Sequence, residues 1–492
     1  MQEYREIETK LLVDDEFVLP ELASIRGIHS VATRTLRLRA TYYDSEDLRL
    51  ARTGTTLRYR TGEGRPCWTL KLGNVASKGL DREELMLEGP ATVIPSVLQD
   101  LVTARLRGAA LQRVVVLRTR RTSSLVVNTD GQELLEIVDD RVEALQNKAV
   151  VRRWRELEVE RRDGGDKVAA RVVTVLTAAG AQLGDQTPKA VRALGPLAAG
   201  PSDLPRPGKV HRKDPAGQLV RWSLVTGLRG LVEHDLGVRR GQDDAVHQLR
   251  VSCRRLRSDL RTFRPLLDDP RAEPLRDELA WLADSFGAAR DLEVLRKRLR
   301  RTAQSDPLAP LDESAVDVLL AGQEQRALAH ALETLRSPRY LVLLQLLHDV
   351  ACDPVLAPTA QGPCADVMPP LVEGLWAHLD KRAGRLGATD PDADWHRARI
   401  LAKRARYGAE TAQVALGKQV GAVRKATKQV QELLGAHQDA AVAASRVLDL
   451  ADAHPDQQGL AVVCGRLAER ERVNLTDIRK EFLRFWKRLS TH

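Results

Sequence analysis

The chain has 492 residues, and its 77 Lys and Arg against 67 Asp and Glu give a formal net charge of +10. A hydrophobic share of 43% and a charged share of 29% exclude a disordered chain and predict two or three globular domains. The positive charge favours anionic partners, but aromatic residues are only 4% of the chain, too few for much stacking on bases. We therefore expect partners recognised through phosphate, and nucleic acid is not expected.

Cysteine usage and hydropathy bear on the compartment. The five cysteines are scattered and form no Cys-x-x-Cys pair, which is typical of a reducing compartment and of a chain without structural zinc. The N-terminus opens on charged residues, and no stretch of about 18 apolar residues occurs. These patterns predict a soluble, cytoplasmic protein.

Residues 1–199 alternate between strand patterns, glycine-rich turns and a few helices. In the strand at residues 6–10, alternation places Glu6, Glu8 and Lys10 on one face. The same one-sided charge recurs at Arg58 and Arg60, Thr69 and Lys71, Arg82 and Glu84, Arg118 and Arg120, and Glu156, Glu158 and Glu160. Two helices, from Pro95 to about Arg107 and from Lys167 to Ala181, are predicted to pack outside the strands.

A sheet with charge on one face has two interpretations. It is either a half-exposed sheet or a barrel with a polar lumen. The mixture of cations and carboxylates favours a lumen that holds phosphates together with a divalent metal. Carboxylate oxygens are ligands for Mg²⁺ or Mn²⁺, while Arg and Lys neutralise the remaining phosphate charge.

The chain changes character near its middle. A polar segment rich in Pro and Gly at 200–209 is predicted to be a linker, and the pattern from 210 to 492 is nearly all helical. A break rich in Pro and Asp at 353–370 divides this helical half in two. We therefore expect a first domain at 1–199 and a second at 210–492.

The helical half contains an internal repeat of a basic segment. His247, Arg250, Arg254, Arg255 and Arg257 correspond to His396, Arg399, Lys403, Arg404 and Arg406, 149 residues later. On a helix, steps of 0, 3, 7 and 10 stay on one face, so each copy presents one His and three cations together. A second match, of Asp291 with Asp439, follows 44 and 43 residues after the two histidines. The repeat predicts a duplicated helical unit with two facing basic surfaces.

An Arg-rich helix is more commonly a solvated face with acidic partners four residues away. Here the residues at that spacing are mostly apolar or cationic. Unneutralised charge on one face lowers stability. The pattern therefore favours a bound polyanion over a solvated face.

The motifs of the first half resemble those of a CYTH domain, the fold of the triphosphate tunnel metalloenzymes. The matching motifs are Glu6-x-Glu8-x-Lys10, Leu38-Arg39 with Tyr42-Tyr43-Asp44, Leu57-Arg58-Tyr59-Arg60, Trp68-Thr69-Leu70-Lys71, Arg82-x-Glu84, Glu156-x-Glu158-x-Glu160 and Thr187-Pro188-Lys189. The resemblance implies an α+β domain with an eight-stranded antiparallel β tunnel and outer helices. The family hydrolyses or cyclises triphosphates with Mg²⁺ or Mn²⁺. The family usually has Ser where this chain has Thr187 or Pro188, but Lys189 is kept.

The resemblance also implies roles for single residues. Metal would be held by Glu6, Glu8, Asp140, Glu156, Glu158 and Glu160, and phosphates would be contacted by Lys10, Arg39, Arg58, Arg60, Lys71, Arg82, Arg120 and Lys189. Asp140 shares strand parity with Glu136, but the register leaves open whether Asp139 or Asp140 joins the metal ligands.

The second half resembles a CHAD domain, a helical module named for its histidines and often fused after a CYTH domain. The resemblance implies an all-α domain of two pseudo-symmetric four-helix bundles that binds inorganic polyphosphate. The implied contacts are His247, Arg250, Arg254, Arg255, Arg257, His396, Arg399, Lys403, Arg404, Arg406 and Lys428. Arg290 aligns with Gln438, so the two halves differ there, and Asp291 and Asp439 are expected to orient arginines or cap helices.

The favoured function is metal-dependent hydrolysis of inorganic triphosphate in the tunnel domain, with polyphosphate held by the helical domain and association with polyphosphate granules. A water would attack a terminal phosphorus in line. The main alternative is a polyphosphate-binding protein without turnover, although the set of carboxylates would then have no use. Adenylate cyclase and thiamine or RNA triphosphatase are weaker alternatives on the same fold, because no base-recognition surface is visible. The sequence assigns no oligomeric state.

Overall fold

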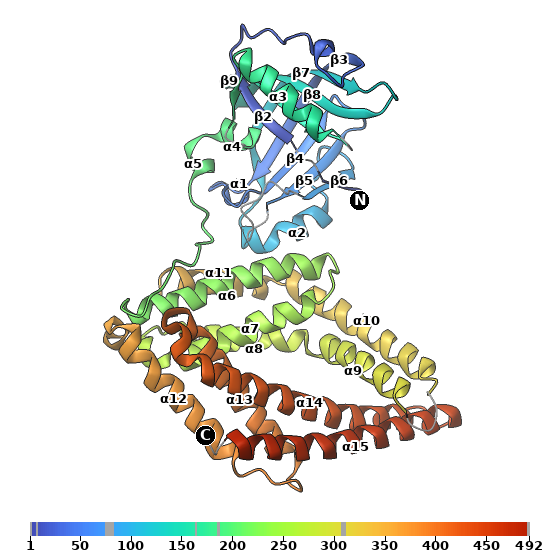
Figure 1. Ribbon diagram of the computed structural model, residues 1–492, viewed down its shortest axis with the longest axis vertical. Coiled ribbons are helices and arrows are strands. Elements are labelled where there is room, and N and C mark those ends of the chain that lie inside the picture. Colours follow the sequence, from blue (N-terminus) through green and yellow to red (C-terminus); the bar gives the residue numbers. More distant parts are fainter. Residues whose placement is uncertain are drawn as a thin grey trace. The chain divides into compact units, whose positions relative to one another are not determined.

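The structure is a computed structural model that describes residues 2–5, 8–73, 83–162, 165–184, 187–306 and 311–489. The chain divides into two compact units, residues 1–205 and 206–492 (Figure 1). Each unit has its own hydrophobic core, and each is described by itself below.

The first unit is built on a ten-stranded antiparallel sheet. Its strands are β1 (Gln2–Arg5), β2 (Glu8–Val13), β3 (Ser30–Asp44), β4 (Thr56–Thr61), β5 (Cys67–Leu72), β6 (Glu83–Glu88), β7 (Gln112–Val127), β8 (Glu133–Gln146), β9 (Ala149–Arg161) and β10 (Gln182–Leu183). The strand order is β1-β6-β5-β4-β3-β7-β8-β9-β2-β10.

The sheet closes on itself through the N-terminal segment. β1 pairs with β6 at one end of the order, and β2 pairs with β9 near the other end. Because β1 and β2 follow one another in the chain, the two ends of the sheet meet. The eight-stranded antiparallel tunnel predicted from the sequence is therefore confirmed, with β10 as a short addition on β2.

The helices of this unit are α1 (Arg49–Arg52), α2 (Ser96–Leu106), α3 (Asp166–Ala178), α4 (Lys189–Leu194) and α5 (Pro196–Ala199). α3 buries Val172 and Leu176 against outward-facing Leu157 and Val159 of β9, so it packs outside the tunnel as expected (Figure 1). α4 packs instead against apolar residues of the inner faces of β3, β7 and β8. It therefore covers one end of the lumen and brings the side chain of Lys189 inside.

The second unit is all helical over its described residues. Its helices are α6 (Ala216–Arg239), α7 (Ala245–Thr262), α8 (Ala272–Ser285), α9 (Gly287–Gln304), α10 (Ser314–Arg336), α11 (Pro338–Cys352), α12 (Cys364–Ala383), α13 (Asp392–Leu416), α14 (Gly421–Asp452) and α15 (Gln458–Leu489). No helix in the described ranges is both long and apolar enough to span a membrane.

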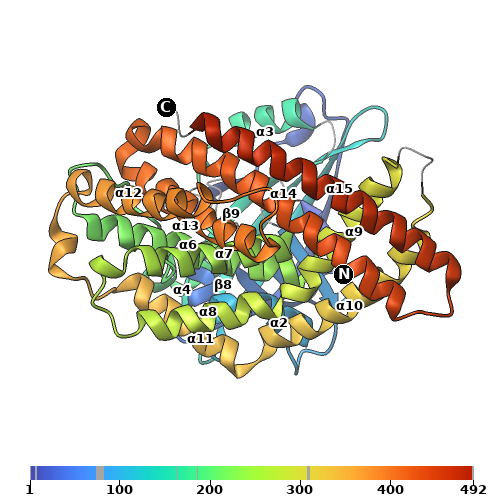
Figure 2. The same cartoon turned by 90° about the horizontal axis from the view of Figure 1, so that it is seen from below.

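The helix order of the second unit repeats, as the duplicated sequence predicts. α6, α7, α8–α9 and α10 correspond to α12, α13, α14 and α15, and each helix packs against the next in both halves (Figure 2). Two differences separate the halves. The helix that corresponds to α14 is broken at Phe286 into α8 and α9, and α11 is an additional helix that packs on α6 and α8.

Candidate functional site

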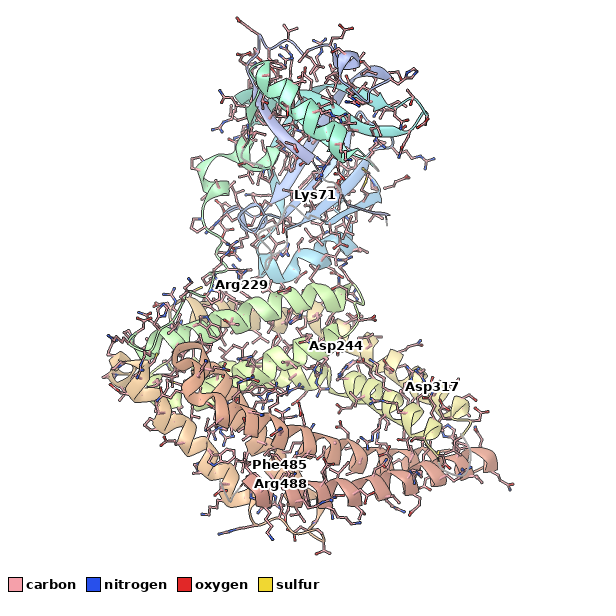
Figure 3. The ribbon with its side chains drawn as sticks, in the orientation of Figure 1. Lys71, Arg229, Asp244, Asp317, Phe485 and Arg488 are labelled. Atoms are coloured by element: carbon pink, nitrogen blue, oxygen red, sulfur yellow. The ribbon has the colours of Figure 1, made fainter. Side chains whose placement is uncertain are left out.

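The tunnel lumen collects most of the residues predicted for metal and phosphate. A single cavity is lined by Glu8, Lys10, Arg58, Arg60, Lys71, Asp140, Glu158, Glu160 and Lys189. They come from six elements, β2, β4, β5, β8, β9 and α4. Figure 3 shows Lys71 among the strands of this unit. The charged faces of β2, β4, β5, β8 and β9 thus point into the lumen, which excludes the half-exposed sheet for these strands.

A group of three carboxylates lies on one wall. Glu8 and Glu160 are cross-strand partners, and the next inward pair along the strands is Lys10 with Glu158. One ligand atom each of Glu8, Glu158 and Glu160 lies within 4.8 Å of the others. Three hard oxygen donors at this separation fit a divalent cation such as Mg²⁺ or Mn²⁺. Glu6, predicted for the same role, lies outside the described residues.

Lys189 neutralises the same wall from α4. Its Nζ lies 2.8 Å from Asp140 Oδ2, 3.1 Å from Glu156 Oε1 and 2.9 Å from Glu158 Oε2. Burial alone would lower the pKa of Lys189, but these three carboxylates raise it well above its usual value. Burial likewise acts to raise the pKa of Glu158, yet Lys189, Lys10 and Arg121 lower it overall. Both groups are therefore charged at neutral pH.

The structure places Asp140, and not Asp139, in the lumen. Asp140 is fully buried and accepts two hydrogen bonds from Arg121, at 2.9 and 2.8 Å. Asp139 points to the opposite face, where it binds Arg155 at 2.9 and 2.7 Å. Asp140 is thus the carboxylate of the lumen, although its partners are cations rather than the three-carboxylate group. Glu156 is also buried beside Lys189, but it is not among the residues that line the cavity.

The opposite wall is mainly cationic. Arg58 and Lys71 share Glu84, at 3.4 and 2.9 Å, and Arg60 lies 3.2 Å from Glu63. Burial and then the neighbouring charge of Arg58 lower the pKa of Arg60. Because these surroundings disfavour the charged form of Arg60, a bound anion would stabilise that form. This wall therefore suits the oxygens of a phosphate chain.

Two predicted phosphate contacts are corrected by the structure. Arg39 and Arg120 are exposed on the outer face of β3 and β7, because the inner face of β3 carries Leu38 and Ala40. The inner arginine of β7 is Arg121, which the sequence reasoning missed. Arg82 lies outside the described residues, so its predicted contact has no structural account.

In the helical unit, the two copies of the basic segment lie on α7 and α13, which pack together. The charges of Arg250, Arg254 and Arg399 all act on Lys403, so cations of both copies gather at one place. The Nε atoms of Arg250, Arg254 and Arg399 are buried, and none has a hydrogen-bond partner in the described part of the chain. In that part, Arg254, Arg399 and Lys403 also form no ion pair. Half-buried cations gathered in one place with so few partners indicate an anion site.

We call Arg250, Arg254, Arg399 and Lys403 the interhelical cluster. Arg250 is the restrained member, since its Nη1 donates to the carbonyls of Phe286 and Gly287, at 3.2 and 2.8 Å, and lies 3.2 Å from Asp291. Phe286 lies at the break between α8 and α9, and its carbonyl also accepts a hydrogen bond from the backbone N–H of Arg290, at 3.3 Å. α14 has no such break in the corresponding place, and Arg399 makes no equivalent contact with a described residue.

The remaining predicted contacts of the helical unit differ in their surroundings. His396 Nδ1 lies 2.6 Å from Gln438, while burial and then the charge of Arg290 lower the pKa of His247. Arg255 and Arg406 share Glu410, at 3.7 and 2.7 Å, which points to a structural role.

Arg257 and Arg404 form no ion pair among the described residues, and Arg404 faces the like charges of Arg261 and Arg276. Lys428 is exposed on α14 beside Glu432, three helical turns before Asp439 and thus about 16 Å along the helix. Lys428 therefore lies apart from the interhelical cluster.

Comparisons with known proteins cover both units. The CYTH domain profile matches residues 4–191, and the CHAD domain profile matches residues 224–448. A relative from Mycobacterium tuberculosis, named Uncharacterized protein Rv2226, is 32% identical over 477 residues, which cover 91% of this chain and 88% of the relative. The CHAD domain structure from the plant Ricinus communis is 27% identical, covering 57% of this chain and 95% of that one, with a TM-score of 0.48. PptA from Streptomyces chartreusis is 24% identical over 56% of this chain and 100% of that one, with a TM-score of 0.47.

Proposed function

Because the chain belongs to the proteins that join a CYTH domain to a CHAD domain, we propose that its tunnel hydrolyses inorganic triphosphate with Mg²⁺ or Mn²⁺ and that its helical unit binds inorganic polyphosphate. CYTH domains are metal-dependent and include triphosphatases and cyclases. The observation that carries the proposal is the lumen itself, where the carboxylates of Glu8, Glu158 and Glu160 share one cavity with six cations.

The residues of the lumen divide the work of phosphoryl transfer. A bound Mg²⁺ or Mn²⁺, held by Glu8, Glu158 and Glu160, would supply positive charge to the phosphate oxygens. Lys71, Arg58 and Arg60 neutralise and orient the chain from the opposite wall. Preorganised cations of this kind lower the barrier because they stabilise the charge of the transition state without rearranging. Water then displaces pyrophosphate from the terminal phosphorus, giving orthophosphate and pyrophosphate.

The lining of the lumen favours a triphosphate without a base. Tyr42 is the single aromatic side chain among the described residues that line the cavity, and its hydroxyl lies 3.4 Å from Arg58. A nucleobase or thiamine ring stacks best on aromatic faces, and Tyr42 is the one such ring that the described lining offers. Inorganic triphosphate needs only cations and metal, so it is the substrate that the lumen fits best.

Phosphate release from tripolyphosphate, ATP and thiamine triphosphate tests the catalytic proposal. With Mg²⁺ or Mn²⁺ present, we expect tripolyphosphate to be hydrolysed with the highest kcat/KM, and EDTA to abolish the reaction. If ATP or thiamine triphosphate is hydrolysed with a higher kcat/KM than tripolyphosphate, the tunnel recognises the organic group. Tight binding of tripolyphosphate without turnover under either metal would favour the non-catalytic alternative.

The interhelical cluster supports the second part of the proposal. Its cations come from two helices, and the ion pair of Arg250 with Asp291 is the single one that they form among the described residues, while Asp439 acts on Arg399 and Lys403 from beyond ion-pair distance. A polymer with a charge on every unit can meet several of these cations at once, so its affinity should grow with chain length. A cluster of this density suits polyphosphate better than isolated phosphate.

Lys403 makes the affinity for polyphosphate depend on pH. Burial and then the charges of Arg399 and Arg254 lower the pKa of Lys403 to about 7, with Arg250 adding to this effect and Asp439 opposing it. A bound polyanion favours the ammonium form and raises this pKa, so binding takes up a proton. Affinity should be highest below pH 7 and fall by about tenfold as the pH rises from 7 to 9.

Isothermal titration of the full chain with long-chain polyphosphate at several pH values measures this effect. The matched control is Lys403→Arg, which stays charged and should show a flatter profile. Titration of the terminal phosphates is common to both proteins and adds negative charge as pH rises, so it acts in the opposite direction. The assignment fails if the two proteins share one pH profile.

A further inference from the structure

Four arginines form a square on the outside of the tunnel. Arg37 and Arg39 lie on β3, and their cross-strand partners on β7 are Arg120 and Arg118. All four side chains are exposed. Residues directly opposite in an antiparallel pair have Cβ atoms about 4.5–5.5 Å apart, so like charges in these positions repel one another. We define these four residues as the outer arginine quartet.

The quartet is not neutralised within the described part of the protein, where none of its four members forms an ion pair or a side-chain hydrogen bond. The nearest acidic side chain in register, Glu143 opposite Arg118, already pairs with Arg153 at 2.9 Å. Arg141 on β8 lies opposite Arg120 and adds another positive charge beside the quartet. The charges therefore remain uncompensated on a rigid sheet.

A hollow adjoins the quartet. It has a volume of about 410 Å³, and Arg39, Arg118, Arg113 and Lys148 line it together with one carboxylate, Glu46. The described residues that line it include no aromatic side chain on which a base could stack, and the apolar part of the lining consists of Leu and Val side chains. Four cations against one carboxylate, on a wall without aromatic rings, match a ligand made of phosphates.

We propose that the outer arginine quartet and its hollow form a second polyphosphate-binding surface, separate from the tunnel lumen. This inference rests on the proposed binding of polyphosphate by the same chain. Inorganic polyphosphate is thin and flexible and carries charge on every unit, so one segment can contact guanidinium groups spaced about one strand apart. Duplex DNA is a wide, stiff rod, which meets a flat square of this size with few of its phosphates.

The test uses the full chain carrying Arg254→Ala and Arg399→Ala, so that binding outside the interhelical cluster is measured. In this background, Arg37, Arg39, Arg118 and Arg120 are all changed to Gln. The matched control changes Arg65, Arg161, Arg162 and Arg336 to Gln, which removes the same net charge from arginines that already have carboxylate partners. Affinity for long-chain polyphosphate is measured by isothermal titration at several salt concentrations.

The quartet variant should bind at least about tenfold more weakly than its background, and the slope of log affinity against log salt should fall by about 3, since each lost contact removes about 0.7. The control should stay within about threefold. Changing the quartet to Lys should restore most of the affinity, which separates lost charge from a damaged fold. An effect no larger than in the control overturns the proposal.

Duplex DNA distinguishes the occupant. If the quartet variant loses DNA binding but keeps polyphosphate binding, the surface belongs to nucleic acid and the proposal is wrong. Hydrolysis of tripolyphosphate by the unaltered chain is measured separately. Its absence would refute the catalytic proposal and would leave the comparison of affinities intact.

Discussion

Changing Glu158 to Gln should lower metal-dependent hydrolysis of tripolyphosphate by about 100- to 1,000-fold, the loss seen when one preorganised electrostatic group is removed. Glu158 has two roles, since it belongs to the carboxylate group with Glu8 and Glu160 and also contacts Lys10 and Lys189 at 3.2 and 2.9 Å. The amide keeps the shape but loses the charge. It would weaken metal binding and leave the cations without their shared partner.

The loss should be independent of pH near neutrality, because the lowered pKa of Glu158 keeps the native carboxylate ionised throughout that range. The matched control is Glu143→Gln, on the outer face of the same sheet and paired with Arg153. It should retain turnover within about twofold, as expected for an exposed pair. The measurement is the steady-state rate of tripolyphosphate hydrolysis by each variant, with circular dichroism as a check that the variant is folded. Wild-type rates for Glu158→Gln would remove Glu158 from the proposed site.

Changing Arg254 and Arg399 together to Ala should weaken the binding of long polyphosphate by about 100-fold or more. Each charge-assisted hydrogen bond contributes about 1.5–3 kcal/mol, and both side chains lack an ion-pair partner among the described residues. Because the two residues lie on α7 and α13, one polymer segment can engage both at once. The double variant should therefore be weaker than either single variant.

A suitable control changes Arg336 and Arg339 to Ala. They are also arginines of the helical unit, but they pair with Glu333 and Glu278 at 2.7 Å. This control removes the same net charge and should change affinity by less than about threefold. Equal losses in the two double variants would mean that overall charge, and not the interhelical cluster, attracts the polymer.

The tunnel fold could be predicted because several strands alternate strictly. In β9, Glu156, Glu158 and Glu160 alternate with Leu157 and Val159, so their common inward face follows from the period of two. β3 also alternates, but the resemblance to CYTH domains implied that Arg39, on its charged face, contacts phosphate in the lumen. Its apolar face points inward because α4 packs into that end of the tunnel, a tertiary contact with no local signal.

β7 was harder because its apolar residues do not alternate. Val114, Val115, Val116 and Leu117 are consecutive, so both faces look apolar and the parity of the following Arg120 and Arg121 is ambiguous. The helical repeat located the basic segments correctly on α7 and α13. Their meeting at one cluster, and the pairing of Arg255 and Arg406 with Glu410, depend on how the two helices pack.

The closure of the tunnel by its first strand has a consequence for biosynthesis. Glu8 leaves the ribosome early, but its partner Glu160 follows 152 residues later. At about 5–20 residues per second, this interval lasts about 8–30 s. Until β9 has been made, the edge of β2 that pairs with β9 has no partner strand. Such long-range pairing is intrinsically slow. The three carboxylates of the proposed metal site therefore come together only after the last long strand has been made, so a nascent chain that ends before β9 holds only one of them.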